Sequence, residues 1–154
     1  KPRKSNDGCA SRFQIATYQN DKGHEKVVVF VDMAPQVPSK TENAAFEWAD
    51  KNRKITVKLD DLDIGALLLV LTGGSEGTGK GLYHKNANGN TVIKLDRAEK
   101  GGFYFGLSTQ REGNTNRLQH TLTDAEAVLL TEVFRAFIVL KYATLTERVP
   151  ISDD

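Results

Sequence analysis

Short runs of alternating apolar and polar residues occur along the chain, interrupted by two longer apolar segments. A period of two is typical of a strand with one buried face, and a longer apolar run with suitable caps is typical of a helix. The first set of strands is predicted at residues 13–18, 26–33, 46–48 and 54–59. The second set is predicted at residues 82–85, 91–97, 103–109 and 118–122. Each set precedes one helix, so the chain repeats an order of four strands and a helix.

The strand at residues 54–59 shows the alternation most clearly. Ile55, Val57 and Leu59 alternate with polar residues, and we expect these three side chains to point into the core. Between two later strands, Gly101 and Gly102 fit a tight hairpin turn, because glycine adopts positive φ without steric cost.

The first helix is predicted within an apolar segment at residues 62–71. Asp60 or Asp61 can cap its beginning, since a short carboxylate accepts hydrogen bonds from the amides of the first turn. Gly73 and Gly74 follow the apolar segment and are expected to end the helix.

The second helix begins at a capping box formed by Thr123 and Glu126 and is predicted to run to about Tyr142. Its apolar residues are too many for one face of a helix. Two interpretations remain open. The helix lies at the centre of the core, or it also forms an interface between subunits.

Composition limits the class of protein. A chain of 154 residues fits one domain, and the hydrophobic fraction of 39% and charged fraction of 27% are typical of a folded protein. The 21 basic and 20 acidic residues leave a net charge of +1, which argues against a polycation. A nucleic-acid-binding protein with this charge must gather its Lys and Arg on particular surfaces. Cys9 is the only cysteine, so neither a disulfide within the chain nor a cysteine metal cluster is expected.

No apolar stretch approaches the roughly 18 residues that a membrane span requires, and we expect no membrane association. The first residue is Lys1 and not methionine, from which we expect that any targeting segment has been removed.

Catalytic and cofactor-binding motifs are weak. Residues 74–81 resemble a phosphate-binding loop, but Gly81 stands where that loop needs Ser or Thr, and the segment follows a helix instead of opening one. We interpret it as a flexible linker. His24, His84 and His120 are scattered, and no nucleophile has a predicted base partner. We therefore predict a protein that is not an enzyme, with no cofactor and no metal.

Aromatic and basic residues recur together on the predicted strands. Bases stack on exposed rings while Lys and Arg contact phosphates, so this pattern favours single-stranded nucleic acid. At residues 103–105, alternation buries either Phe103 and Phe105 or Tyr104, and the sequence does not decide between them.

Several short strings occur in a specific order. Residues 46–51 read Phe-Glu-Trp-Ala-Asp-Lys, residues 55–59 read Ile-Thr-Val-Lys-Leu, and residues 63–67 read Asp-Ile-Gly-Ala-Leu. Together with residues 92–95, 102–110 and 122–126, they resemble the Whirly family over about residues 12–142. The same superfamily includes the kinetoplastid mitochondrial RNA-binding proteins and, more remotely, the PUR-repeat proteins.

The resemblance implies an α+β fold with two antiparallel four-stranded sheets in the order ββββα-ββββα. It implies that the helices pack at the core of a homotetramer, or of a heterotetramer with a paralogue, and that single-stranded DNA or RNA runs over the sheets. It also implies an organelle, mitochondrion or plastid. The expected boundaries are a flexible basic arm at residues 1–11, one domain at residues 12–143 and a tail at residues 144–154.

The candidate nucleic-acid-binding residues are aromatic, basic or polar residues of the predicted strands and of the segment around the single tryptophan. They are Arg12, Gln14, Tyr18, Lys26, Phe30, Trp48, Lys51, Arg53, Lys54, Tyr83, Lys85, Lys94 and Arg97.

One departure from the resemblance keeps a second hypothesis open. Plant Whirly members carry a Lys-Gly-Lys-Ala-Ala-Leu motif on the first strand, whereas residues 8–13 read Gly-Cys-Ala-Ser-Arg-Phe here. With the low net charge, this departure favours a structural subunit that keeps the fold without binding free strands.

Overall fold

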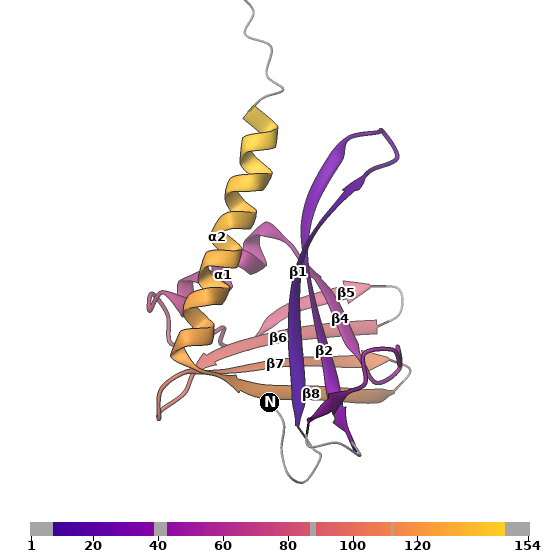
Figure 1. Cartoon of the computed structure of the whole chain (residues 1–154), viewed down its shortest axis with the longest axis vertical. Helices are drawn as coiled ribbons and strands as arrows, with labels where there is room; N and C mark the ends of the chain where they lie inside the picture. Colours follow the sequence, from indigo (N-terminus) through magenta and orange to yellow (C-terminus); the bar gives the residue numbers. More distant parts are fainter. Residues whose placement is uncertain (1–7, 39–42, 87–88, 112, 147–154) are drawn as a thin grey trace, which may run out of the picture.

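The computed structural model describes residues 8–38, 43–86, 89–111 and 113–146, which form two antiparallel four-stranded sheets and two helices (Figure 1). The first half comprises β1 (Cys9–Gln19), β2 (Glu25–Val37), β3 (Ala45–Phe46), β4 (Ile55–Leu59) and α1 (Asp61–Leu71). The second half comprises β5 (Leu82–Asn86), β6 (Gly89–Arg97), β7 (Phe103–Arg111), β8 (Asn114–Leu122) and α2 (Asp124–Thr146). The predicted fold class and element order are confirmed.

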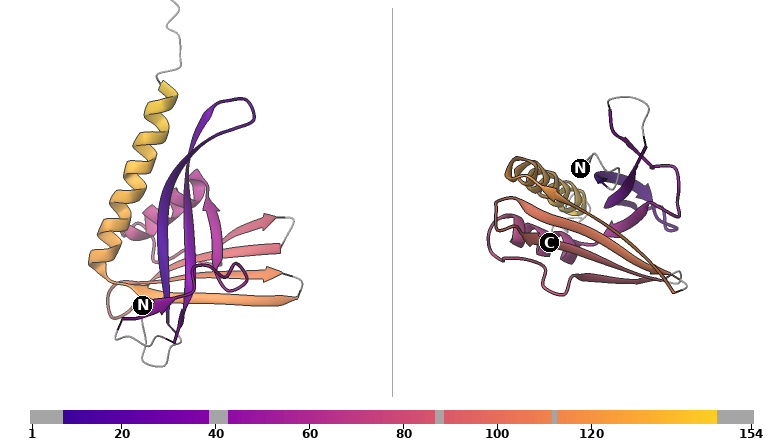
Figure 2. Two further views of the ribbon diagram at one scale, coloured as in Figure 1. Left: turned by 45° about the vertical axis from the view of Figure 1, so that its right-hand side comes forward. Right: turned by 90° about the horizontal axis from the view of Figure 1, so that it is seen from below.

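The two sheets differ in their connectivity. In the N-terminal sheet, β2 is central and pairs with β1 on one side and with β4 and the short β3 on the other. In the C-terminal sheet the strands follow sequence order, β5-β6-β7-β8. The strands of the N-terminal sheet run across those of the C-terminal sheet, and the β1–β2 hairpin extends beyond the region where they overlap (Figures 1 and 2).

The core lies between the inner faces of the two sheets. Val29, Val31 and Met33 of β2 are completely buried, as are Ile93 and Leu95 of β6. The inward alternation predicted for β4 is confirmed, because its three apolar residues are all buried.

Residues 103–105 resolve the alternative that the sequence left open. Phe103 and Phe105 are buried in the core, whereas Tyr104 is 56% exposed on the outward face. The aromatic residue available to a ligand on β7 is therefore Tyr104.

Both predicted helix starts are confirmed by reciprocal caps. Asp63 N donates to Asp60 Oδ1 at 2.8 Å, and Asp60 N donates to Asp63 Oδ2 at 2.8 Å. At α2, Thr123 N donates to Glu126 Oε2 at 2.7 Å and Glu126 N donates to Thr123 Oγ1 at 3.2 Å. Over the described residues, neither helix is long and apolar enough to cross a membrane.

Some element boundaries differ from the predictions. β1 begins at Cys9, so residues 9–11 of the expected arm pair with β2 instead. β8 begins at Asn114, four residues before its predicted start, because polar residues pair through their backbones without contributing apolar alternation. α2 continues to Thr146, so residues 144–146 of the expected tail are helical. Residues 1–7 and 147–154 lie outside the described residues.

The glycine-rich segment is not the flexible linker that the sequence suggested. Thr78 N donates to Leu95 O at 2.9 Å, and Arg97 N donates to Glu76 O at 2.7 Å. These bonds attach the segment to the part of β6 that β5 does not reach, where backbone groups still need partners. The segment then leads into a strand, which is not the geometry of a phosphate-binding loop.

The β6–β7 turn yields a test of the fold. Gly102 has φ +73°, and a Cβ atom there would lie 2.2 Å from Leu122 O. We expect Gly102→Ala to lower the free energy of unfolding by about 3 kcal/mol, because steric overlap adds to the cost of a left-handed backbone. Gly101→Ala is the matched control: φ is also positive, but the nearest atom is 3.4 Å away, so we expect a loss of about 1 kcal/mol. Equal losses in chemical denaturation would contradict this packing.

Candidate nucleic-acid interface

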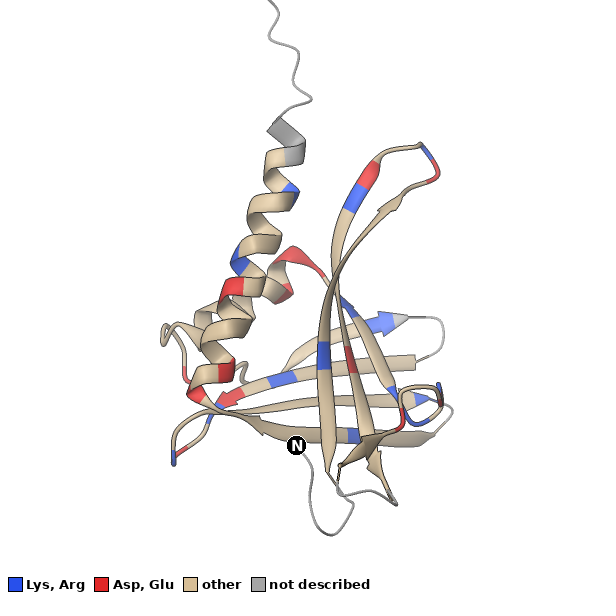
Figure 3. Cartoon of the chain, in the orientation of Figure 1, with Lys and Arg blue, Asp and Glu red and all other residues tan. Residues whose placement is uncertain are grey.

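The outward face of the N-terminal sheet gathers many of the predicted binding residues. Phe13 of β1 packs on the core, so its even-numbered neighbours face outward. The register places Arg12 opposite Asp32, Gln14 opposite Phe30, and Tyr18 opposite Lys26. The residues of this face that carry rings, cations or polar groups are Arg12, Gln14, Tyr18, Lys26, Phe30, Asp32, Lys54, Thr56 and Lys58. Figure 3 shows Lys and Arg on strands of both sheets.

Asp32 lies at the centre of this face and is only 6% exposed. Its Oδ2 is 2.6 Å from Arg12 Nη2 and 3.8 Å from Lys54 Nζ, and its Oδ1 accepts a 2.5 Å hydrogen bond from Thr56 Oγ1. Burial alone would raise the pKa of Asp32, but the hydrogen bonds from Thr56 and Arg12 and the charges of Lys54 and Arg12 outweigh it and lower the pKa below 3.8. The carboxylate is therefore ionised at neutral pH.

Trp48 follows β3 and lies at the edge of the same face. The Arg12 guanidinium carbon is 5.0 Å from the centre of the indole, and the Phe46 ring centre is 6.4 Å from it. In the exposed turn that follows, Lys51 and Arg53 face solvent. Arg53 O accepts a 3.0 Å hydrogen bond from Asn116 Nδ2, which connects this turn to β8 of the C-terminal sheet.

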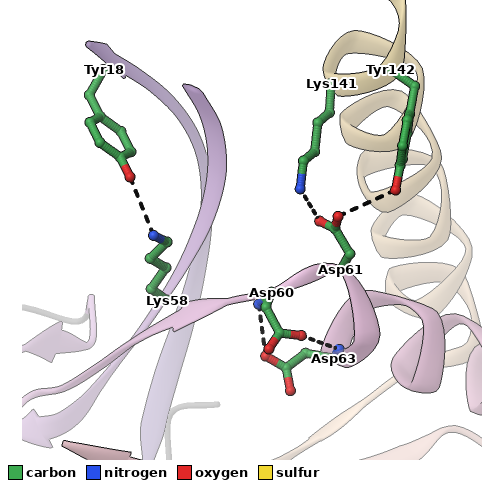
Figure 4. Close-up of polar contacts among 7 residues, drawn as sticks. All are labelled: Tyr18, Lys58, Asp60, Asp61, Asp63, Lys141 and Tyr142. Atoms are coloured by element: carbon green, nitrogen blue, oxygen red, sulfur yellow. Dashed lines mark hydrogen bonds and ion pairs between the residues drawn. The ribbon is translucent and has the colours of Figure 1, made fainter. Parts of the chain in front are cut away.

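Tyr18, near the turn of the β1–β2 hairpin, and Lys58 of β4 form a second pairing of a ring with a cation. Lys58 Nζ lies 5.6 Å from the centre of the Tyr18 ring and 3.4 Å from its hydroxyl (Figure 4). An open groove of about 560 Å³ separates this pair from α2, where Lys141 and Tyr142 both contact the Asp61 carboxylate. Lys58 was missing from the sequence-based set, although its alternation with Val57 and Leu59 identifies it as outward.

The outward face of the C-terminal sheet carries a separate set of candidate residues. Tyr83 and Lys85 are exposed on β5, and Lys94 lies on β6 with Nζ 3.7 Å from Asp96. An open groove of about 620 Å³ crosses this face. Its lining includes exposed aromatic and basic residues that the predicted set omits, which are Lys80, Tyr104 and Arg117. Strand alternation predicts the outward direction of Tyr104 and Arg117 once the Phe residues are assigned to the core.

Arg97 lies apart from the other candidate residues. Residues three apart on a strand point to opposite faces, so Arg97 does not share a face with Lys94. Its guanidinium carbon is 4.9 Å from the centre of the buried Phe103 ring and its Nη2 is 3.8 Å from Asp124. The structure therefore places Lys94 and Arg97, both candidate binding residues, on opposite faces of the C-terminal sheet.

Two histidines connect elements of the core. His84 Nε2 lies 2.9 Å from Asp63 Oδ2, within the α1 cap, and His120 Nε2 lies 2.8 Å from Ser11 Oγ, between β8 and β1. Among the described residues, no group of three His, Cys, Asp or Glu side chains has the proximity that a metal site needs.

The ionised Asp32 yields a prediction for the acid range. Since its pKa is lower in the folded chain than in the unfolded chain, its stabilisation is complete well above pH 3.8 and is lost as the pH falls through the folded-state value. We expect Asp32→Asn to lower the free energy of unfolding by roughly 2 kcal/mol at pH 7. The difference in unfolding free energy between this variant and the parent protein, measured by urea titration, should become smaller below pH 4. A difference that stays unchanged down to pH 2 would contradict the assignment. Asp21→Asn, in the exposed hairpin turn, controls for the loss of one negative charge.

Comparison with known proteins gives matches at the level of structure. No protein-family model and no curated protein matches this sequence. The WHY3 structure from Arabidopsis thaliana aligns with a TM-score of 0.68 and 16% identity, over 94% of this chain and 90% of that one. The MRP1/MRP2 structure from Trypanosoma brucei aligns with a TM-score of 0.57 and 19% identity, over 90% of each chain.

A third solved structure, of a guide-RNA-binding protein complex bound to a guide RNA, aligns with a TM-score of 0.54 and 19% identity. The match covers 88% of this chain and 93% of that one. These three alignments cover between 88% and 94% of this chain. The chain therefore has the Whirly fold, which it shares with plant WHY3 and the trypanosome MRP1/MRP2 proteins.

Proposed function

We propose that this chain binds single-stranded DNA or RNA with little sequence preference, on the outward faces of its two sheets. The observation that carries the proposal is the outward face of the N-terminal sheet, where Arg12, Lys26 and Lys58 lie among the rings of Tyr18 and Trp48. A structural relative bound to a guide RNA supports the same class of ligand.

Stacking and phosphate contacts explain why such binding would tolerate many sequences. Every base has a flat face that can stack on a ring, at about 1–3 kcal/mol for each base, and every nucleotide has a phosphate that can pair with Lys or Arg. Both candidate faces are open, so neither encloses a base as a sequence-reading pocket would. Such a protein would protect strands, hold them for annealing or maintain a transcript or genome, without acting as an enzyme.

Apolar residues on the helices support assembly into a homotetramer, or into a heterotetramer with a paralogue. Leu62 of α1 is 85% exposed and Leu129 of α2 is 69% exposed. Further large apolar residues on these helices are exposed as well: Leu69, Val128, Val139, Leu140 and Tyr142. Covering them with helices from other subunits would remove this surface from water. The Whirly resemblance also leads us to propose an organelle, mitochondrion or plastid, as the location.

The structural-subunit hypothesis remains a second candidate, because several candidate cations already have acidic partners. Arg12 and Lys54 share Asp32, Lys94 is near Asp96, and Arg97 is near Asp124. A phosphate would have to compete with these carboxylates, whereas Lys26 lies outside these ion pairs.

Charge reversal on the N-terminal sheet tests the binding proposal. We expect the double variant Lys26→Glu and Lys58→Glu to bind a single strand of about 30 nucleotides at least tenfold more weakly, since it replaces two phosphate contacts by repulsion. The slope of log affinity against log salt should become shallower by about 1.4, the value for two phosphates on a single strand. Fluorescence anisotropy at several salt concentrations measures both.

Lys100→Glu, in the exposed β6–β7 turn, is the matched control and should leave affinity nearly unchanged. Equal weakening by the double variant and the control would contradict the assigned face. Failure of the parent protein to bind single-stranded DNA, single-stranded RNA or duplex would instead favour the structural subunit.

Sedimentation equilibrium tests the proposed assembly. We expect the parent protein to sediment as four chains and Leu129→Glu to dissociate it, because a buried carboxylate in an apolar interface is strongly unfavourable. Lys100→Glu should remain assembled. A tetramer that survives both substitutions would exclude the exposed centre of α2 from the interface.

A further inference from the structure

We propose that Asp32 is a positioning residue that holds the Arg12 guanidinium over the Trp48 ring, so that the two side chains form one composite stacking platform for a base. The inference deepens the proposed function and rests on it. It assigns to an acidic residue a role in binding an anionic ligand.

The position of Asp32 provides the first argument. It lies on the central strand of the N-terminal sheet, directly opposite Arg12 on β1 and Thr56 on β4. One carboxylate oxygen accepts from Arg12 at 2.6 Å and the other accepts from Thr56 at 2.5 Å. With each oxygen already occupied and the side chain buried, Asp32 is placed to hold its neighbours and not to receive a base.

The position of Arg12 provides the second argument. A free Arg side chain populates many rotamers, and fixing it costs about 2 kcal/mol of entropy, so a partner that holds it in advance removes that cost from ligand binding. Asp32 fixes one end of the guanidinium, while the group itself lies 5.0 Å from the Trp48 ring centre. The Arg12 side chain is still 46% exposed, so the platform is open to solvent.

The chemistry of stacking provides the third argument. Unstacked bases lie on aromatic rings and also on guanidinium planes. The Arg12 guanidinium lies over the indole, and its side chain is itself half-exposed, so it adds a flat group on which a base can stack. The platform therefore presents stacking area and positive charge at one point, as a base with its adjoining phosphate requires.

Trp48 provides a direct probe, because it is the only tryptophan in the chain. If Asp32 holds Arg12 over the indole, Asp32→Asn should release the guanidinium and raise the acrylamide quenching constant of the free protein about twofold. Asp21→Asn, which removes one negative charge from the hairpin turn of the same sheet, should leave quenching unchanged. Unchanged quenching in folded Asp32→Asn would overturn the proposal.

The affinity for single strands gives the second measurement, and the two possible roles of Asp32 predict changes of opposite direction. Removing a negative charge from a binding face should strengthen binding if Asp32 only neutralises its neighbours. If Asp32 positions the platform, its loss should instead weaken binding about tenfold. This corresponds to the lower part of the stacking free energy known for one base. We expect weaker binding by Asp32→Asn and no change in Asp21→Asn. Tighter binding by Asp32→Asn would overturn the proposal.

Arg12→Lys tests the platform independently if circular dichroism shows that Asp32→Asn does not fold. This substitution keeps the charge but removes the planar group. We expect the same loss of affinity with an unchanged salt slope, and full affinity in Arg12→Lys would overturn the platform. If the parent protein binds no strand, the proposed function fails, while the quenching comparison still decides whether Asp32 positions Arg12.

Discussion

The packing of two sheets across one core constrains everything else in this molecule. Each strand gives alternate side chains to that core, so only the remaining positions can meet a ligand. Met33 and Asp32 illustrate the division: they are neighbours on β2, yet one is buried among apolar residues and the other holds cations on the opposite face. The candidate interface therefore consists of the strand positions that do not face the core, and these recur at every second residue.

This constraint explains which parts of the structure the sequence could predict. Ile55, Val57 and Leu59 alternate strictly, and their strand was correctly placed. The capping residues of both helices were also identified, because their short side chains act locally on the first turn. The beginning of β8 was not predicted, since residues 114–117 are polar on both faces and pair only through their backbones. Backbone pairing with another strand does not require a particular pattern of apolar and polar residues, so the local sequence does not reveal it.

The candidate site was harder to predict, because it depends on which residues lie opposite one another. Arg12 and Tyr18 could be chosen as exposed cation and ring, but nothing near Arg12 in sequence indicates that Asp32 faces it. Lys94 and Arg97 were both chosen as candidates, but they are three residues apart on one strand, so the period of two already indicates that they point to opposite faces. Tyr104 could be identified as an outward-facing ring only once Phe103 and Phe105 were known to be buried in the core.

The near-zero net charge is compatible with nucleic-acid binding, because electrostatic attraction acts locally. At physiological salt the screening length is about 8 Å, so a phosphate on the N-terminal sheet responds mainly to the charges near it. These include Lys26, Lys58 and Arg12, and also Asp61 of α1, which lines the same groove as Lys26 and Lys58. A carboxylate within that distance still matters, and Asp32 is such a group. Asp32 is buried whereas the Arg12 side chain bound to it is half-exposed, so an approaching strand meets the guanidinium more readily than the carboxylate. The same negative charge can therefore order the cation that a phosphate meets, while contributing less repulsion than an exposed carboxylate on this face would.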